Sequence, residues 1–121
     1  MSTDNRLLTC KIGEDIAEKY LISRGYKVLC RNFRKRVGEI DLIAEFCGKI
    51  IFIEVKTRKS EIFGEPEDSI SKNKTRKIFH TGTTFMRDNG LKNAFQIDVV
   101  SIKLNEYNVL KRLTHFKNVC L

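Results

Sequence analysis

The sequence has no tryptophan, one proline and no apolar run near the roughly 20 residues that a membrane-spanning helix needs. Its first residues lack the basic and apolar blocks of a signal peptide. No Ser/Gly-rich linker or internal repeat interrupts the chain. We therefore expect a single domain over residues 1–121, located in the cytoplasm.

Cysteine is sparse and widely spaced. The four cysteines, Cys10, Cys30, Cys47 and Cys120, form no CxxC or CxxxC pair. Disulfide frameworks belong mostly to small secreted domains, and zinc sites usually contain closely spaced pairs. We interpret all four as reduced thiols; the alternative is a zinc site assembled from scattered Cys and His residues.

Acidic residues are outnumbered by basic ones. The chain has 23 Lys and Arg against 15 Asp and Glu, a net charge of +8. This excess favours a polyanionic partner, either nucleic acid or an acidic membrane surface. Six residues of the basic clusters are predicted to contact a nucleic-acid backbone: Arg31, Arg34, Arg36, Arg58, Lys59 and Lys74. For any one of them, a solvated surface charge is the alternative.

Hydrophobic periodicity predicts helices and strands in a definite order. Apolar residues at helical spacing indicate a helix over about residues 8–24, which Gly25 ends. A second helix is predicted over about 68–88, with Asp68 as its N-cap. Strands are predicted over 26–33, 37–46, 49–57, 94–104 and 107–119, with a loop at 58–67. The order helix, three strands, helix, two strands fits an α/β or α+β layer fold.

Carboxylates interrupt two of these apolar strands. If the two strands form a hairpin with a two-residue loop at Cys47-Gly48, Asp41 lies directly opposite Glu54. Like charges placed opposite each other are destabilising. A divalent metal between Asp41 and Glu54 would convert this repulsion into ligation. The alternative is that both carboxylates are simply solvated.

The same register places Glu39 opposite Lys56, which would form an ordinary ion pair across the strands in the absence of a site. Glu14 lies at the edge of the apolar face of the first helix, and Gly13 near its centre would let the helix approach the sheet closely. From the residues alone, Glu14 is better explained as a solvated acid of the first helix, which favours the helix dipole.

A series of motifs in this order resembles a known family. The motifs are Gly13-Glu14, Gly25-Tyr26, Arg31-Asn32-Phe33-Arg34, Gly38-Glu39-Ile40-Asp41-Leu42-Ile43, Phe52-Ile53-Glu54-Val55-Lys56-Thr57-Arg58 and Asp98-Val99-Val100. Over about residues 11–102 the chain resembles the YraN family of small bacterial endonuclease-like proteins. That family is similar to Holliday-junction resolvases and to the PD-(D/E)xK nuclease superfamily. Ile40 stands where the superfamily pattern has proline, which leaves the ligand positions intact.

The resemblance implies an α/β fold with a restriction-endonuclease-like core: helix, three strands, helix, strand, plus an extra C-terminal strand, in a mixed sheet flanked by helices. It implies catalytic roles for Asp41, Glu54, Lys56 and Glu14. Of these, Asp41, Glu54 and Glu14 would bind Mg²⁺ or Mn²⁺, and Glu39 would be a further ligand or a partner of Lys56.

The implied function is metal-dependent hydrolysis of phosphodiester bonds in DNA, in branched repair or recombination intermediates or in ordinary duplex. DNA rather than a membrane is then the expected partner, and a homodimer is expected by analogy with resolvases. The alternatives are a non-catalytic nucleic-acid-binding module with the same fold, and an electrostatic adaptor for an acidic surface. No role is predicted for His115 beyond that of a strand-end or core residue.

Overall fold

The structure is a computed structural model that describes residues 3–59 and 71–119. The elements are α1 (Thr3–Ser23), β1 (Lys27–Lys35), β2 (Gly38–Phe46), β3 (Lys49–Lys59), α2 (Lys72–Asp88), β4 (Phe95–Leu104) and β5 (Leu110–Phe116). This is the predicted order of helices and strands.

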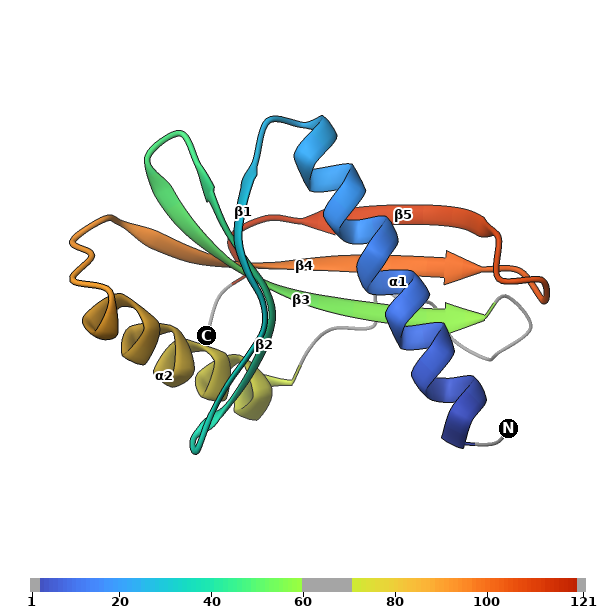
Figure 1. The fold of residues 1–121 in the computed structure, drawn as a ribbon, viewed down its shortest axis with the longest axis horizontal. Helices are drawn as coiled ribbons and strands as arrows, with labels where there is room; N and C mark the ends of the chain where they lie inside the picture. The colour runs from blue at the N-terminus through green and yellow to red at the C-terminus, as the bar shows by residue number, and fades with distance from the viewer. Residues whose placement is uncertain (1–2, 60–70, 120–121) are drawn as a thin grey trace.

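The strands form one five-stranded sheet in the order β1-β2-β3-β4-β5. Strands β3 and β4 are parallel, and the other neighbours are antiparallel. A parallel pair needs a crossover, which α2 provides between β3 and β4. Figure 1 shows α1 across one face of the sheet and α2 on the other, with β1 and β2 running steeply across the direction of β3. The α/β mixed sheet confirms the predicted fold class and is consistent with a restriction-endonuclease-like fold.

The two helices cover two separate parts of the core. Residues such as Leu42, Ile53 and Val100 are buried on the α1 side, and residues such as Phe52 and Ile78 on the α2 side. Burial on both faces explains why the central strands read as continuous apolar runs.

Gly13 brings α1 against β3. A Cβ atom at this position would overlap the side chain of Thr57, so only glycine allows the observed approach. The close contact predicted for Gly13 is therefore confirmed. It fixes the height of α1 above the sheet, and with it the position of the neighbouring Glu14.

The hairpin between β2 and β3 has the predicted two-residue loop. Cys47 and Gly48 have φ angles of 51° and 79°, the left-handed combination that suits a tight turn between twisted strands. The paired residues run from Phe46 opposite Lys49 to Leu42 opposite Ile53, in the predicted register. Asp41 and Glu54 are the next residues along the two strands. The predicted register is therefore present up to the pair beside them.

Several boundaries differ from the prediction. Ser71 caps α2, its Oγ accepting a hydrogen bond from the backbone N–H of Lys74, whereas the predicted cap Asp68 lies outside the described residues. Arg58 and Lys59 belong to β3 rather than to the loop, and the rest of that predicted loop is not described.

The last strand is shorter than predicted, because a turn stabilised by Asn105 precedes it. The Asn105 side-chain oxygen accepts hydrogen bonds from the N–H groups of Tyr107 and Val109. These contacts satisfy the backbone locally and delay the start of β5 to Leu110.

Neither α1 nor α2 combines the length with the apolar character that crossing a bilayer requires. Cys10, Cys30 and Cys47 are free thiols, as predicted, and Cys120 lies outside the described residues.

Candidate metal centre and active site

A cavity of about 560 Å³ lies where β2 diverges from β3. Four of the predicted acidic residues line it: Glu14 from α1, Glu39 and Asp41 from β2, and Glu54 from β3. The remaining lining residues are Leu7, Cys10, Lys11, Arg31, Asn32, Arg34, Val55, Thr57 and Lys74. Residues far apart in the sequence are thus gathered by five elements around one hollow.

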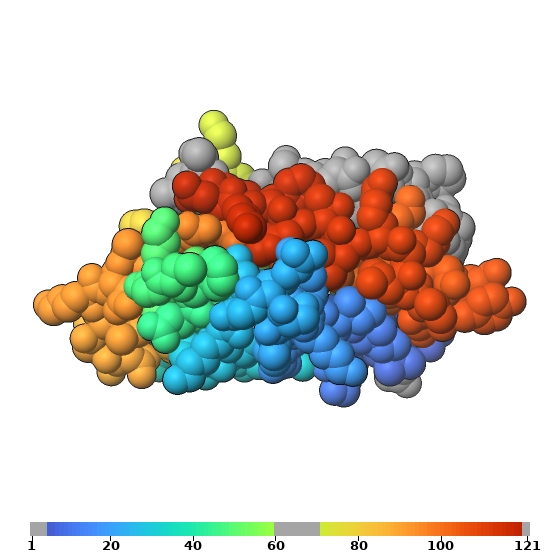
Figure 2. All heavy atoms as spheres, turned by 90° about the horizontal axis from the view of Figure 1, so that it is seen from above, coloured from blue at the N-terminus to red at the C-terminus, as the bar shows by residue number. Residues whose placement is uncertain are grey.

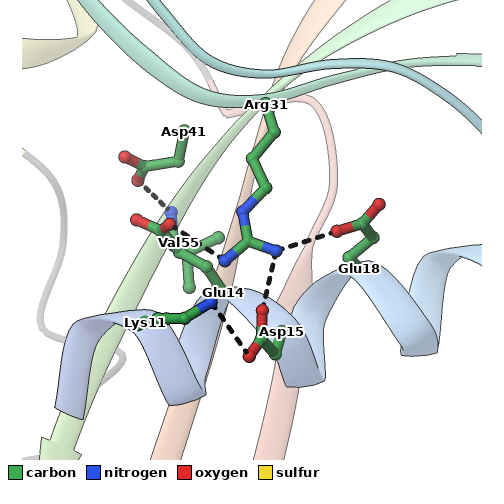
Figure 3. Close-up of polar contacts among 7 residues, drawn as sticks. All are labelled: Lys11, Glu14, Asp15, Glu18, Arg31, Asp41 and Val55. Carbon is green, nitrogen blue, oxygen red and sulfur yellow. Dashed lines mark hydrogen bonds and ion pairs between the residues drawn. The ribbon is translucent and has the colours of Figure 1, made fainter. Parts of the chain in front are cut away.

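Asp41 lies at the point where the two strands separate. Its Oδ2 accepts a hydrogen bond of 2.8 Å from the backbone N–H of Val55, so its carboxylate continues the contact between β2 and β3 after the last backbone pair. Figure 3 shows this carboxylate directed at Val55 on β3. Asp41 is therefore fixed beside Glu54, as predicted, but by a side-chain contact rather than by a backbone pair.

The two carboxylates repel each other in a buried setting. The Glu54 side chain is 7% exposed. Burial, and then the charge of Glu54, raise the pKa of Asp41 from 3.8 to about 8, against the hydrogen bond from Val55, which lowers it. Asp41 therefore holds a proton at neutral pH in the absence of a cation between the two groups.

Lys74 supplies a cation to this pair from α2. Its Nζ lies 2.5 Å from Oε2 of Glu54. Burial lowers the pKa of Lys74, but the hydrogen bond and charge of Glu54 outweigh this and raise it overall. Lys74 was predicted to contact nucleic acid, and its contact with Glu54 was not predicted. No sequence signal indicated this contact, because the predicted helix began at about residue 68 and placed Lys74 beyond its first turn.

Arg31 is engaged by α1, as Figure 3 shows. Its guanidinium lies 2.7 Å from Asp15, 3.0 Å from Glu18 and 3.5 Å from Glu14. Burial would lower the pKa of Arg31, but the hydrogen bonds that it donates to Asp15 and Glu18 raise it overall. Arg31, predicted to contact nucleic acid, thus has its charge balanced within the protein, and it holds Glu14 at the edge of the cavity.

The predicted pairing of Glu39 with Lys56 is wrong. At this end β2 pairs with β1, so Glu39 lies opposite Arg34, and its Oε2 is 3.3 Å from Nε of Arg34. Lys56 lies opposite Ser101 of β4. The strong divergence of β2 from β3 explains the difference, because the hairpin register no longer determines neighbours beyond Leu42.

Of the other predicted basic residues, one lines the cavity and three do not. Arg34 is in the lining, whereas Arg36 is exposed in the turn between β1 and β2. Arg58 and Lys59 lie at the end of β3, and Arg58 donates to the carbonyl of Thr57. Lys56 is half-buried and also lies outside the lining.

Asn32 adds local backbone strain next to Asp41. It lies between the register pairs Arg31–Leu42 and Phe33–Ile40, which places it opposite Asp41, and its φ is 55°. A left-handed residue within a strand is uncommon, although Asn tolerates it better than most. Such conformations concentrate at functional sites, because packing elsewhere has to hold them in place.

The donor set fits a hard divalent cation. Mg²⁺ is commonly held by one or two carboxylates, with water and phosphate oxygens completing its shell. Asp41 and Glu54 provide two adjacent carboxylates, and Val55 lies in the same lining. Within residues 3–59 and 71–119, no three His, Cys, Asp or Glu side chains are close enough to surround an ion. Glu14, held by Arg31, would therefore contribute through water.

The family is decided by sequence similarity. Residues 13–102 match the uncharacterised protein family UPF0102. The chain belongs to the UPF0102 family. A UPF0102 protein of Caldanaerobacter subterraneus subsp. tengcongensis is 36% identical over 120 residues, covering 98% of both chains. One from Sulfurihydrogenibium sp. is 48% identical over 97 residues, covering 79% of this chain and 84% of the relative. One from Clostridioides difficile is 40% identical over 107 residues, covering 88% and 90%.

This UPF0102 protein has a second buried polar cluster, which sequence analysis did not predict. His115 Nε2 lies 2.8 Å from Asp98 Oδ2, and its Nδ1 lies 2.9 Å from the hydroxyl of Tyr20. Burial would raise the pKa of Asp98, but hydrogen bonds from His115, the Asn118 backbone and Gln96 hold it below its usual value. Figure 2 shows β5 in red beside the blue residues of α1 and β1. The cluster joins β4 and β5 to α1, and its members are not in the lining of the cavity.

Proposed function

We propose that this UPF0102 protein is a metal-dependent nuclease that hydrolyses phosphodiester bonds in DNA. The observation that carries the proposal is that Asp41 and Glu54 lie together in the lining of one cavity, where burial and then the charge of Glu54 raise the pKa of Asp41 to about 8. Two carboxylates held side by side at a cavity destabilise the fold, and a bound divalent cation would offset this cost. The motif resemblance to YraN-type endonuclease-like proteins supports the same reaction class.

Each residue has a distinct role in this proposal. Asp41 and Glu54 hold Mg²⁺ or Mn²⁺ with the help of the Val55 carbonyl, and Glu14 acts through a bound water. When bound, the metal activates water and stabilises charge on the phosphate. Lys56 orients the attacking water or neutralises charge that develops on the phosphate oxygens.

Basic residues around the cavity would hold the DNA backbone. Arg34 and Arg36 lie on the β1–β2 hairpin, Arg58 and Lys59 at the end of β3, and Lys74 at the start of α2. Contacts of this kind are independent of sequence and weaken as salt rises. The net charge of +8 favours the same partner. A homodimer would present two such sites to a branched substrate with two-fold symmetry.

The test is cleavage of a panel of branched, flapped, duplex and single-stranded DNA with Mg²⁺ or Mn²⁺. We expect cleavage by the wild type, and its loss in EDTA and in Asp41→Ala and Glu54→Ala. Glu106→Ala is a matched control, because Glu106 is exposed at the β4–β5 turn. Cleavage by both active-site variants at the wild-type rate would refute the site.

A second candidate is a non-catalytic nucleic-acid-binding module. It is favoured by the contacts of Lys74 with Glu54 and of Arg31 with Glu14, which neutralise two carboxylates without a metal. DNA affinity that is equal in EDTA and Mg²⁺, with no cleavage of any DNA in the panel, would support this function instead.

A further inference from the structure

We propose that Lys74 is a built-in counter-cation that leaves Glu54 when a divalent metal binds and then contacts the substrate phosphate. This inference rests on the proposed function, because it assumes that Asp41 and Glu54 bind a metal. Lys74 then has two positions, one in the metal-free protein and one in the loaded protein. The first of these positions is the contact with Glu54.

The contact with Glu54 has the geometry of a replaceable cation. Glu54 is almost fully buried at 7% exposure, whereas the Lys74 side chain is 56% exposed, with its Nζ 2.5 Å from the carboxylate. A buried carboxylate needs a partner, and here it is a flexible chain that enters from the surface. Lys74 can therefore withdraw into solvent without any change in the helix.

The start of α2 directs positive charge at the acidic pair. Ser71 caps the helix by accepting from the N–H of Lys74, so Lys74 is in the first turn, which contains no acidic residue. The helix dipole disfavours a cation here, and the charges of Glu54, Asp41 and Glu39 offset that cost. The acidic residues thus attract the Lys74 ammonium group when no metal is bound, and a divalent metal in the loaded protein.

The two cations compete for the same oxygens. A metal between Asp41 and Glu54 would repel an ammonium group that stays 2.5 Å from Glu54. The displaced Lys74 still lines the cavity, where a phosphate bound to the metal would be within its reach. Release of Lys74 thereby couples metal loading to substrate binding.

The first experiment is a calorimetric titration of Mn²⁺ into wild type and Lys74→Met without DNA. We expect Lys74→Met to bind Mn²⁺ about tenfold more tightly, an ordinary magnitude for coupling between two ligands. Lys74→Arg keeps the competing charge and should bind no more tightly than the wild type. Lys72→Met removes a charge from the same turn, outside the cavity lining, and should leave the affinity near the wild-type value. Equal or weaker binding by Lys74→Met would overturn the exchange.

A second readout is thermal unfolding in EDTA and in saturating Mn²⁺. Lys74→Met should have a lower Tm than the wild type in EDTA, because Glu54 loses its partner, and Mn²⁺ should remove most of this difference. A Tm difference that is equal in both conditions would assign Lys74 a purely structural role and refute the exchange.

The third readout is the affinity for a DNA duplex in Ca²⁺, measured by fluorescence anisotropy. Lys74→Met should weaken binding several-fold in Ca²⁺ and less in EDTA; an equal loss in both would contradict the phosphate contact. Absence of Mn²⁺ binding by the wild type would refute the proposed function together with this inference. Normal wild-type binding with no effect of Lys74→Met would refute the exchange alone.

Discussion

Replacing Asp41 by asparagine should stabilise the metal-free protein. The amide has nearly the shape of the carboxyl group and keeps an oxygen that can accept from the N–H of Val55. It removes the charge that Glu54 opposes. Asp41→Asn is therefore expected to raise the stability of the protein and to abolish its function, as substitutions at strained active sites commonly do.

The size and pH dependence of this gain follow from the pKa of Asp41. Between its ordinary value of 3.8 and the value of about 8 in the fold, the native protein holds a proton that the unfolded chain has lost. Wild-type stability therefore falls as pH rises through this window. The full shift corresponds to an upper bound of about 6 kcal/mol at about 1.4 kcal/mol per pKa unit. Solvent screening and Lys74 reduce the expected gain for Asp41→Asn to roughly 1–4 kcal/mol at pH 8.

The assay is urea unfolding followed by circular dichroism, in EDTA, at pH 5 and pH 8. The stability gain of Asp41→Asn should be small at pH 5 and largest at pH 8. Glu106→Gln, which removes an exposed charge, should show no such trend. A gain that is equal at both pH values, or a loss of stability at pH 8, would refute the raised pKa of Asp41.

Three further substitutions test other parts of the structure. Gly13→Ala should lower the free energy of unfolding by roughly 1–3 kcal/mol, because its Cβ would overlap Thr57; urea unfolding at neutral pH that matches the wild type would contradict this. Asp98→Asn should cost roughly 1.5–3 kcal/mol at pH 7, because a charge-assisted bond to His115 is lost. The pKa of Asp98 is lowered in the fold, so this cost should shrink as pH falls below about 4 in acid-unfolding curves, and a pH-independent cost would be the contrary result. Lys56→Met should reduce single-turnover DNA cleavage roughly 100-fold with unchanged Mn²⁺ affinity, whereas an equal loss of both would make Lys56 part of the metal site.

The order of the elements and the central pairing were predictable because local signals determine them. The turn at Cys47-Gly48 sets the register of β2 and β3, and that register brings Asp41 beside Glu54. Gly13 was recognisable as a close-contact position from its place on the apolar face of α1. These features depend on residues near one another in the chain or on a simple period.

The partners of the charged residues were not predictable, because they depend on how the layers are placed. Lys74 meets Glu54 only because the first turn of α2 lies beside the middle of β3, and Arg31 meets α1 only because the helix crosses β1. Because β1 and β2 twist away from β3, Glu39 is paired with Arg34 rather than with the predicted partner Lys56. Single-sequence patterns carry no information on such distances.

The central claim is that Asp41 and Glu54 hold a divalent cation. The most direct measurement is a calorimetric titration of Mn²⁺ into wild type, Asp41→Asn and Glu54→Gln at pH 8. We predict saturable binding by the wild type and no detectable binding by either variant. Absence of binding by the wild type, or wild-type affinity in both variants, would contradict the metal site.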